Sequence, residues 1–131
     1  MIYEFCAENV TLLEKAMQAG ARRIELCDNL AVGGTTPSYG VTKAAVELAA
    51  NYDTTIMTMI RPRGGDFVYT DLEIAIMLED IRLTTQAGSQ GVVFGALTAD
   101  KKLDKPNLEK LIAASKGMEI VFHMAFDELS D

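Results

Sequence analysis

The feature that most constrains the fold is a regular alternation of short apolar segments with longer amphipathic ones. The short segments are rich in β-branched residues and predict strands at 2–6, 23–27, 54–60, 91–95 and 118–123. The longer segments have helical spacing and predict helices at 10–19, 41–50, 70–87 and about 106–115. Strands that alternate with helices favour a parallel sheet built from right-handed crossovers. The chain is therefore predicted to be α/β.

Local signals support the helix boundaries. Thr70 and Glu73 have the spacing of a capping box, in which each side chain accepts a hydrogen bond from the other residue's backbone. Gly20 and Gly88 follow two of the helices as stop signals, and Pro106 suits the first turn of the last helix.

Two architectures accept this order: an open doubly wound sheet, or the first part of a (β/α)8 barrel of the TIM type. Glu4 and Cys6 share one face of the first strand, and Glu25 with Cys27 repeats the pattern on the second. An open sheet covered by helices on both faces would bury these carboxylates at considerable cost. The barrel is favoured because its lumen can expose them to water.

The length, 131 residues, fits one domain, but a complete barrel needs about 250 residues. We expect a single domain over 1–131 that forms an incomplete barrel of five strands and four helices. Its first and fifth strands would be open edges, so we expect either a homo-oligomer or a further C-terminal segment to cover them.

Charge and composition exclude several classes of protein. A net charge of −7 argues against nucleic-acid binding, and no apolar run is long enough to span a bilayer. The N-terminus has no basic segment or cleavage site, so we expect a cytoplasmic protein without a signal peptide. Walker A, Cys-x-x-Cys, Gly-x-Ser-x-Gly and Gly-x-Gly-x-x-Gly patterns are all lacking.

Cys6 and Cys27 are the candidate metal ligands. Both are expected at the carboxyl ends of neighbouring strands, in equivalent positions, where the sites of such barrels lie. Thiolates are soft ligands that suit Cu(I). The alternative is that both cysteines are small buried apolar residues.

Arg61, Arg63 and Asp66 form a second group, after the third strand and around a Gly-Gly turn. Two guanidinium groups beside exposed backbone N–H groups suit a phosphate or carboxylate ligand. The alternative for Arg61 is a structural one, in which it neutralises Glu4 or Glu25 inside the lumen.

His123 and Asp127 form a third group. His123 is the sole histidine, it ends the fifth strand, and Asp127 can orient its imidazole. With Glu4 and Glu25 these residues are candidates for acid/base catalysis. The alternative is a histidine that packs in the core.

Several strings resemble the CutC copper homeostasis family. They are Glu4-Phe-Cys6, Ile24-Glu-Leu-Cys27 with the following Gly33–Gly40 loop, Ile60-Arg-Pro-Arg-Gly-Gly-Asp-Phe67 with Tyr69, and Phe122-His-Met-Ala-Phe-Asp127. The resemblance covers essentially the whole chain and departs from the family at Met124, where arginine is usual.

The resemblance implies a TIM-type barrel of which this chain holds the first five strands, and copper binding at Cys6 and Cys27. We therefore expect a cytosolic copper homeostasis protein that binds Cu(I). A second hypothesis is an enzyme that acts on a small anionic metabolite, held by Arg61 and Arg63, with Glu4, Glu25 or His123 transferring a proton. A third is a half-barrel whose site is incomplete.

Overall fold

The computed structural model describes residues 4–122. Strands and helices alternate along this part of the chain, as predicted. The strands are β1 (Glu4–Glu8), β2 (Arg23–Cys27), β3 (Thr55–Met59), β4 (Gly91–Phe94) and β5 (Glu119–Phe122). The helices are α1 (Leu13–Gln18), α2 (Tyr39–Ala49), α3 (Asp71–Ala87) and α4 (Lys105–Ala114), with a short 3-10 turn at Leu30–Val32.

Two predicted boundaries near the N-terminus were wrong. Strand β1 continues to Glu8, so Cys6 lies in the middle of the strand and not at its end. Helix α1 begins at Leu13, three residues later than predicted, because Leu12 adopts a left-handed backbone with φ of 58°. The helical spacing of 10–19 predicts Leu12 on one face with Leu13, Ala16 and Met17, but Leu12 precedes the helix and is 58% exposed.

The capping signals of α3 are confirmed. The Thr70 hydroxyl accepts a hydrogen bond from the Glu73 backbone N–H, and the Glu73 carboxylate accepts one from the Thr70 N–H. Gly88 ends the helix with φ of 94°, a conformation that strains any residue with a β-carbon.

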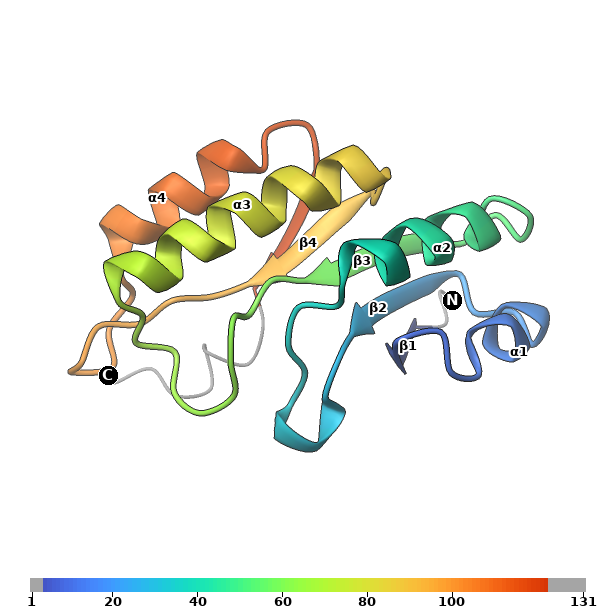
Figure 1. Cartoon of the computed structure of the whole chain (residues 1–131), viewed down its shortest axis with the longest axis horizontal. Coiled ribbons are helices and arrows are strands. Elements are labelled where there is room, and N and C mark those ends of the chain that lie inside the picture. Colours follow the sequence, from blue (N-terminus) through green and yellow to red (C-terminus); the bar gives the residue numbers. More distant parts are fainter. Residues whose placement is uncertain (1–3, 123–131) are drawn as a thin grey trace.

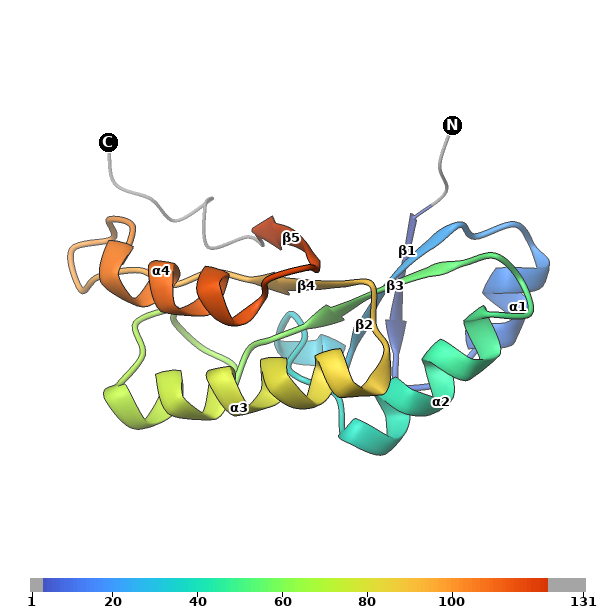
Figure 2. The same cartoon turned by 90° about the horizontal axis from the view of Figure 1, so that it is seen from above.

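The five strands form one parallel sheet in the order β1-β2-β3-β4-β5. A doubly wound sheet reverses its strand order, and this sheet does not. Because right-handed crossovers between consecutive neighbours place every helix on the same side, the order is that of a barrel. Figures 1 and 2 show the helices on one side of the twisted sheet.

The apolar core lies between that face of the sheet and the helices. Ile24, Leu26 and Ile56 pack against α1 and α2, and Val92 and Phe94 pack against α3 and α4. Side chains on a strand alternate between faces, so the residues between these ones lie on the helix-free face. Packing against the helices stabilises one face of the sheet, and the other face is available to form a site.

The sheet curls toward its helix-free face. Arg23 of β2 forms an ion pair with Glu119 of β5 at 2.9 Å, although β3 and β4 separate the two strands in the sheet. On the same face, a β-carbon added at Gly91 would lie 2.5 Å from the Met57 Sδ and 2.6 Å from the Glu119 carbonyl oxygen. Glycine at position 91 thus allows the close packing that accompanies the curvature.

This packing predicts the effect of a single methyl group. Gly91→Ala should lower the free energy of unfolding by about 1–3 kcal/mol, because the Met57 side chain can move but the Glu119 backbone cannot. Gly40→Ala in α2 is the matched control, since a β-carbon there would meet only the Ser38 hydroxyl at 3.9 Å. Urea unfolding of both variants and the native chain checks the prediction. A Gly91→Ala variant as stable as the native chain would contradict it.

Candidate functional site

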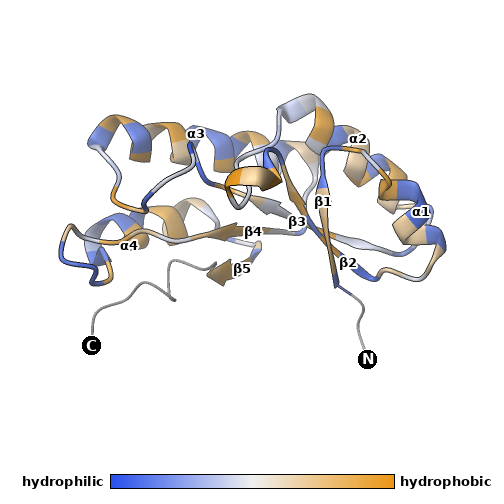
Figure 3. Ribbon diagram, turned by 90° about the horizontal axis from the view of Figure 1, so that it is seen from below, coloured by the Kyte–Doolittle hydropathy of each residue, from blue (hydrophilic) through white to orange (hydrophobic). Residues whose placement is uncertain are grey.

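The helix-free face of the sheet carries the charged and sulfur-containing side chains of the strands. The strand register arranges them in a short first row of Glu4, Arg23 and Thr55 and two longer rows that follow it across the sheet. The lower row holds Cys6, Glu25, Met57, Gly91 and Glu119, and the upper row holds Glu8, Cys27, Met59, Val93 and Val121. Strands β1 and β2 include hydrophilic positions, whereas β4 and β5 are mainly hydrophobic, as Figure 3 shows. The polar chemistry therefore gathers at the β1–β2 side.

Cys6 and Cys27 lie on this same face of adjacent strands, but not in equivalent positions as predicted. Cys6 is opposite Glu25, and Cys27 is opposite Glu8. The two cysteines are thus diagonal neighbours, offset by one row. Cys6 is exposed, and Cys27 is buried at the end of β2.

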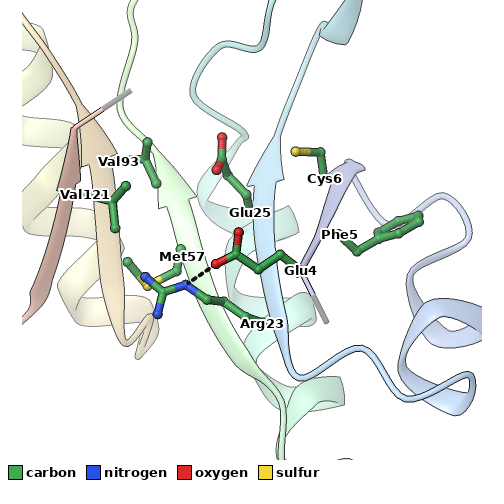
Figure 4. A pocket seen from close by; sticks show the side chains of 8 residues that line it. All are labelled: Glu4, Phe5, Cys6, Arg23, Glu25, Met57, Val93 and Val121. Atoms are coloured by element: carbon green, nitrogen blue, oxygen red, sulfur yellow. Dashed lines mark ion pairs between the residues drawn. The ribbon is translucent and has the colours of Figure 1, made fainter. Parts of the chain in front are cut away.

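A cavity of about 140 Å³ opens beside the lower row. The Cys6 thiol points toward β2, the strand that carries Glu25, at one end of it, and the ion pair between Arg23 and Glu4 lies nearer the start of the strands, as Figure 4 shows. Met57, Val93 and Val121 supply the apolar side of the cavity. A volume of this size suits an ion or a very small molecule.

Arg23 lines the cavity and is a residue of the candidate site that the sequence analysis missed. Its guanidinium pairs with Glu4 at 3.3 Å and with Glu119 at 2.9 Å, and its side chain is 21% exposed. The charge that balances the lumen carboxylates therefore comes from Arg23, not from Arg61. Its position on the same face of β2 as Glu25 and Cys27 was the signal that could have found it.

The carboxylates and burial make both thiols weak acids. Partial burial, followed by the charges of Glu25 and Glu4, raises the pKa of Cys6. Burial, followed by the charge of Glu25, raises the pKa of Cys27 to about 12. Burial also raises the pKa of Glu25 itself, with the Glu4 charge acting in the same direction. Both thiols are protonated at neutral pH.

Arg61 has a structural role in this geometry. It is 3% exposed and follows the end of β3, where its Nη atoms donate to the carbonyl oxygens of Val32 and Gly34 at 2.6 and 3.0 Å, and of Gly65 at 2.8 Å. Its guanidinium also lies over the Phe67 ring at 4.8 Å. Arg61 therefore holds the glycine loop after β2, and no ion pair to Glu4 or Glu25 is found within residues 4–122.

Arg63 and Asp66 are engaged with each other and with α3. Arg63 pairs with Glu73 at 2.6 Å and with Asp66 at 3.0 Å. The hydrogen bond from Arg63 lowers the pKa of Glu73, and the Val68 N–H, followed by Arg63, lowers the pKa of Asp66. This network neutralises the positive charge that was expected to attract an anion.

The tyrosine beside these arginines is buried. The Arg63 guanidinium lies over the Tyr69 ring at 5.2 Å, and burial raises the pKa of Tyr69 to about 12 despite the nearby charges of Arg61 and Arg63. Arg61, Arg63, Asp66 and Tyr69 follow the carboxyl end of β3, whereas Glu4 and Arg23 begin their strands. The structure thus separates the arginine group from the carboxylate group.

Two predicted catalytic residues, His123 and Asp127, lie outside the described residues. Within 4–122, no cluster of three or more histidine, cysteine, aspartate or glutamate side chains has the geometry of a metal site. No helix in this same range has the length and apolar character that a membrane span requires.

Comparison with known proteins identifies the family. The model of the CutC family matches residues 1–131. A CutC family protein from Streptococcus pyogenes is 55% identical over 98% of this chain, and one from Enterococcus faecalis is 53% identical over 99%. The chain spans 62% of the length of each of these two relatives.

A solved CutC structure from Streptococcus agalactiae superposes with a TM-score of 0.95 at 49% identity. It covers 99% of this chain, which corresponds to 62% of that chain. The sheet and its four helices are thus part of a TIM-barrel-like fold, and the predicted fold class is confirmed.

The electrostatics of the two thiols predict their reactivity. Iodoacetamide at pH 7.5 should alkylate Cys6 in the folded chain and leave Cys27 unmodified, because Cys27 is buried and the thiolate is the reactive species. Glu25→Gln should speed the alkylation of Cys6 several-fold, since Glu25 raises the Cys6 pKa. Mass spectrometry of the digested protein measures both rates.

Glu47→Gln is the control for this experiment, because Glu47 is an exposed carboxylate of α2, on the opposite side of the sheet. Its rates should equal those of the native chain. An unchanged Cys6 rate in Glu25→Gln would show that Glu25 does not act on the thiol.

Proposed function

Because this chain belongs to the CutC family, we propose that it is part of a cytosolic copper homeostasis protein whose ligand is Cu(I). The thiolates of Cys6 and Cys27 are the proposed ligands. The solved relative from Streptococcus agalactiae carries a name that connects it with copper homeostasis. The observation that carries the proposal is the placement of both cysteines on the helix-free face of adjacent strands.

The donor chemistry of this face fits the proposal. Cu(I) prefers soft thiolate and thioether ligands, and cysteine and methionine side chains are grouped here with apolar valines. Cys6 is exposed beside the cavity and supplies the point of entry, whereas Cys27 is buried and supplies a ligand shielded from water. Binding requires both thiols to lose their protons, and Glu25 is the adjacent carboxylate that can accept one.

The oligomeric state is part of the same proposal. Within residues 4–122, β1 and β5 each pair with one strand only. Phe5 of β1 is 36% exposed and Phe122 of β5 is 40% exposed. In a complete barrel every strand is hydrogen-bonded to a neighbouring strand on each side. We therefore propose that residues 1–131 form one incomplete barrel domain, whose edges a second copy or further chain covers.

One observation favours a second candidate function, an enzyme that acts on a small anionic metabolite by acid/base chemistry. The cavity combines a carboxyl group of raised pKa, Glu25, with the guanidinium of Arg23. Glu25 would transfer the proton, and an anion in the cavity would bind Arg23 by displacing Glu4 or Glu119 from its guanidinium. Arg61 and Arg63, the residues expected to bind the anion, are engaged with partners outside the cavity.

An anaerobic Cu(I) competition titration tests the copper proposal. The native chain should bind one Cu(I) in the presence of a chelator strong enough to outcompete isolated thiols. Cys6→Ser and Cys27→Ser should each weaken binding by about a hundredfold or more, because a direct ligand is lost.

Cys27→Ala accompanies the serine variants, since a hydroxyl in this apolar site is itself destabilising. Circular dichroism confirms that each variant is folded. Weak binding by the native chain, or affinity that neither substitution changes, would exclude the cysteine site. Binding of phosphate or small carboxylates that Arg23→Gln abolishes would then support the enzyme.

A further inference from the structure

Cys27 lies in a buried cluster with two methionines, Met57 and Met59, and Met59 is the one that lies with it beside Gly34. The Sγ of Cys27 lies 3.0 Å from the point where a β-carbon on Gly34 would stand, and the Cε of Met59 lies 3.6 Å from the same point. Cys27 and Met59 each follow the last register pair of β2 and β3, Leu26 with Thr58, and both belong to one buried cluster with Met57 and Val93. The methyl end of Met59 therefore turns toward β2 and the Cys27 thiol.

The loop after β2 encloses this pair. Gly34 has φ of 97° and fits over Cys27 only because it lacks a side chain. Arg61 fixes the loop by donating to the Gly34 and Val32 carbonyl oxygens. As a result, Cys27 and Met59 are only 1% and 3% exposed. Cys27 and Met59 are thus both shielded from water beside a loop that the buried Arg61 guanidinium fixes.

The neighbouring methionine on β3 is oriented differently. The Sδ of Met57 lies 2.5 Å from the β-carbon position of Gly91 on β4, and its Cε lies 2.3 Å from it. Its sulfur is directed to the β4 side of β3, whereas Cys27 is on the β2 side. Of the two methionines on this face, Met59 is therefore the better candidate to bind the same copper ion as the cysteines.

We infer that the thioether of Met59 is the third sulfur ligand of Cu(I) bound by Cys6 and Cys27. The inference rests on the copper function proposed above and adds a ligand to its two cysteines. A third soft donor suits Cu(I), and a neutral thioether adds it without burying a further charge. The cavity beside Cys6 gives access, and the Gly34 loop closes the site on the Cys27 side.

The test compares Met59→Leu with Met77→Leu, two volume-conserving substitutions of fully buried methionines. Met77 belongs to α3, is buried in the core on the other side of the sheet, and serves as the control. Met59→Leu should weaken Cu(I) binding by at least about tenfold, and Met77→Leu should leave it unchanged. Circular dichroism and urea unfolding show whether each variant keeps its fold.

A second readout identifies the ligand directly. When the chain is labelled with selenomethionine, copper-edge X-ray absorption of the one-to-one Cu(I) complex should show a selenium neighbour. The neighbour should disappear in labelled Met59→Leu and persist in labelled Met77→Leu. A folded Met59→Leu chain that keeps both native affinity and the selenium signal would overturn the inference.

The failure of this inference differs from the failure of the proposed function. If Cys6→Ser and Cys27→Ser lose binding while Met59→Leu retains it without a selenium neighbour, the cysteine site stands and Met59 is not a ligand. If the native chain does not bind Cu(I) under competition, both are overturned.

Discussion

The handedness of the β-α-β crossovers determines where a site can form in this chain. Five parallel strands in sequential order, joined by right-handed connections, place all four helices on one face. The apolar residues of alternate strand positions are buried beneath those helices. The other face is therefore the concave one, and the ion pair between Arg23 and Glu119 across it shows how strongly the sheet curls.

The concave face carries charged groups near the start of the strands and thiols farther along them. Near the start of the strands, Arg23 balances Glu4 and Glu119, so the negative charge of the lumen is partly neutralised. Farther along, Cys6 is exposed beside a small cavity and Cys27 is enclosed by the Gly34 loop. Arg61, buried behind that loop, stabilises the enclosure through backbone carbonyls and not through a ligand of its own. Arg23 thus balances charge on the concave face, and Arg61 fixes the loop that covers Cys27.

Much of the fold could be predicted from sequence because periodicity and caps are local signals. Strand β2 and the capping box at Thr70 were predicted at the observed residues. The extent of β1 could not be, because pairing with β2 as far as Glu8 is a tertiary property. The same limit applies to the site: Glu25 and the cysteines were found from alternation, but the partners of Arg23 and Arg61 depend on curvature and on a loop conformation. A sequence pattern shows which residues share a face, not which of them touch.

The central claim is that the helix-free face, at the β1–β2 side, is the metal-binding surface. Anomalous diffraction at the copper edge from anaerobically Cu(I)-loaded crystals of this chain tests it most directly. The account predicts one strong peak between Cys6 and Cys27, on the face of the sheet opposite the helices. A peak elsewhere on the molecule, with no density between the two thiols, would contradict it.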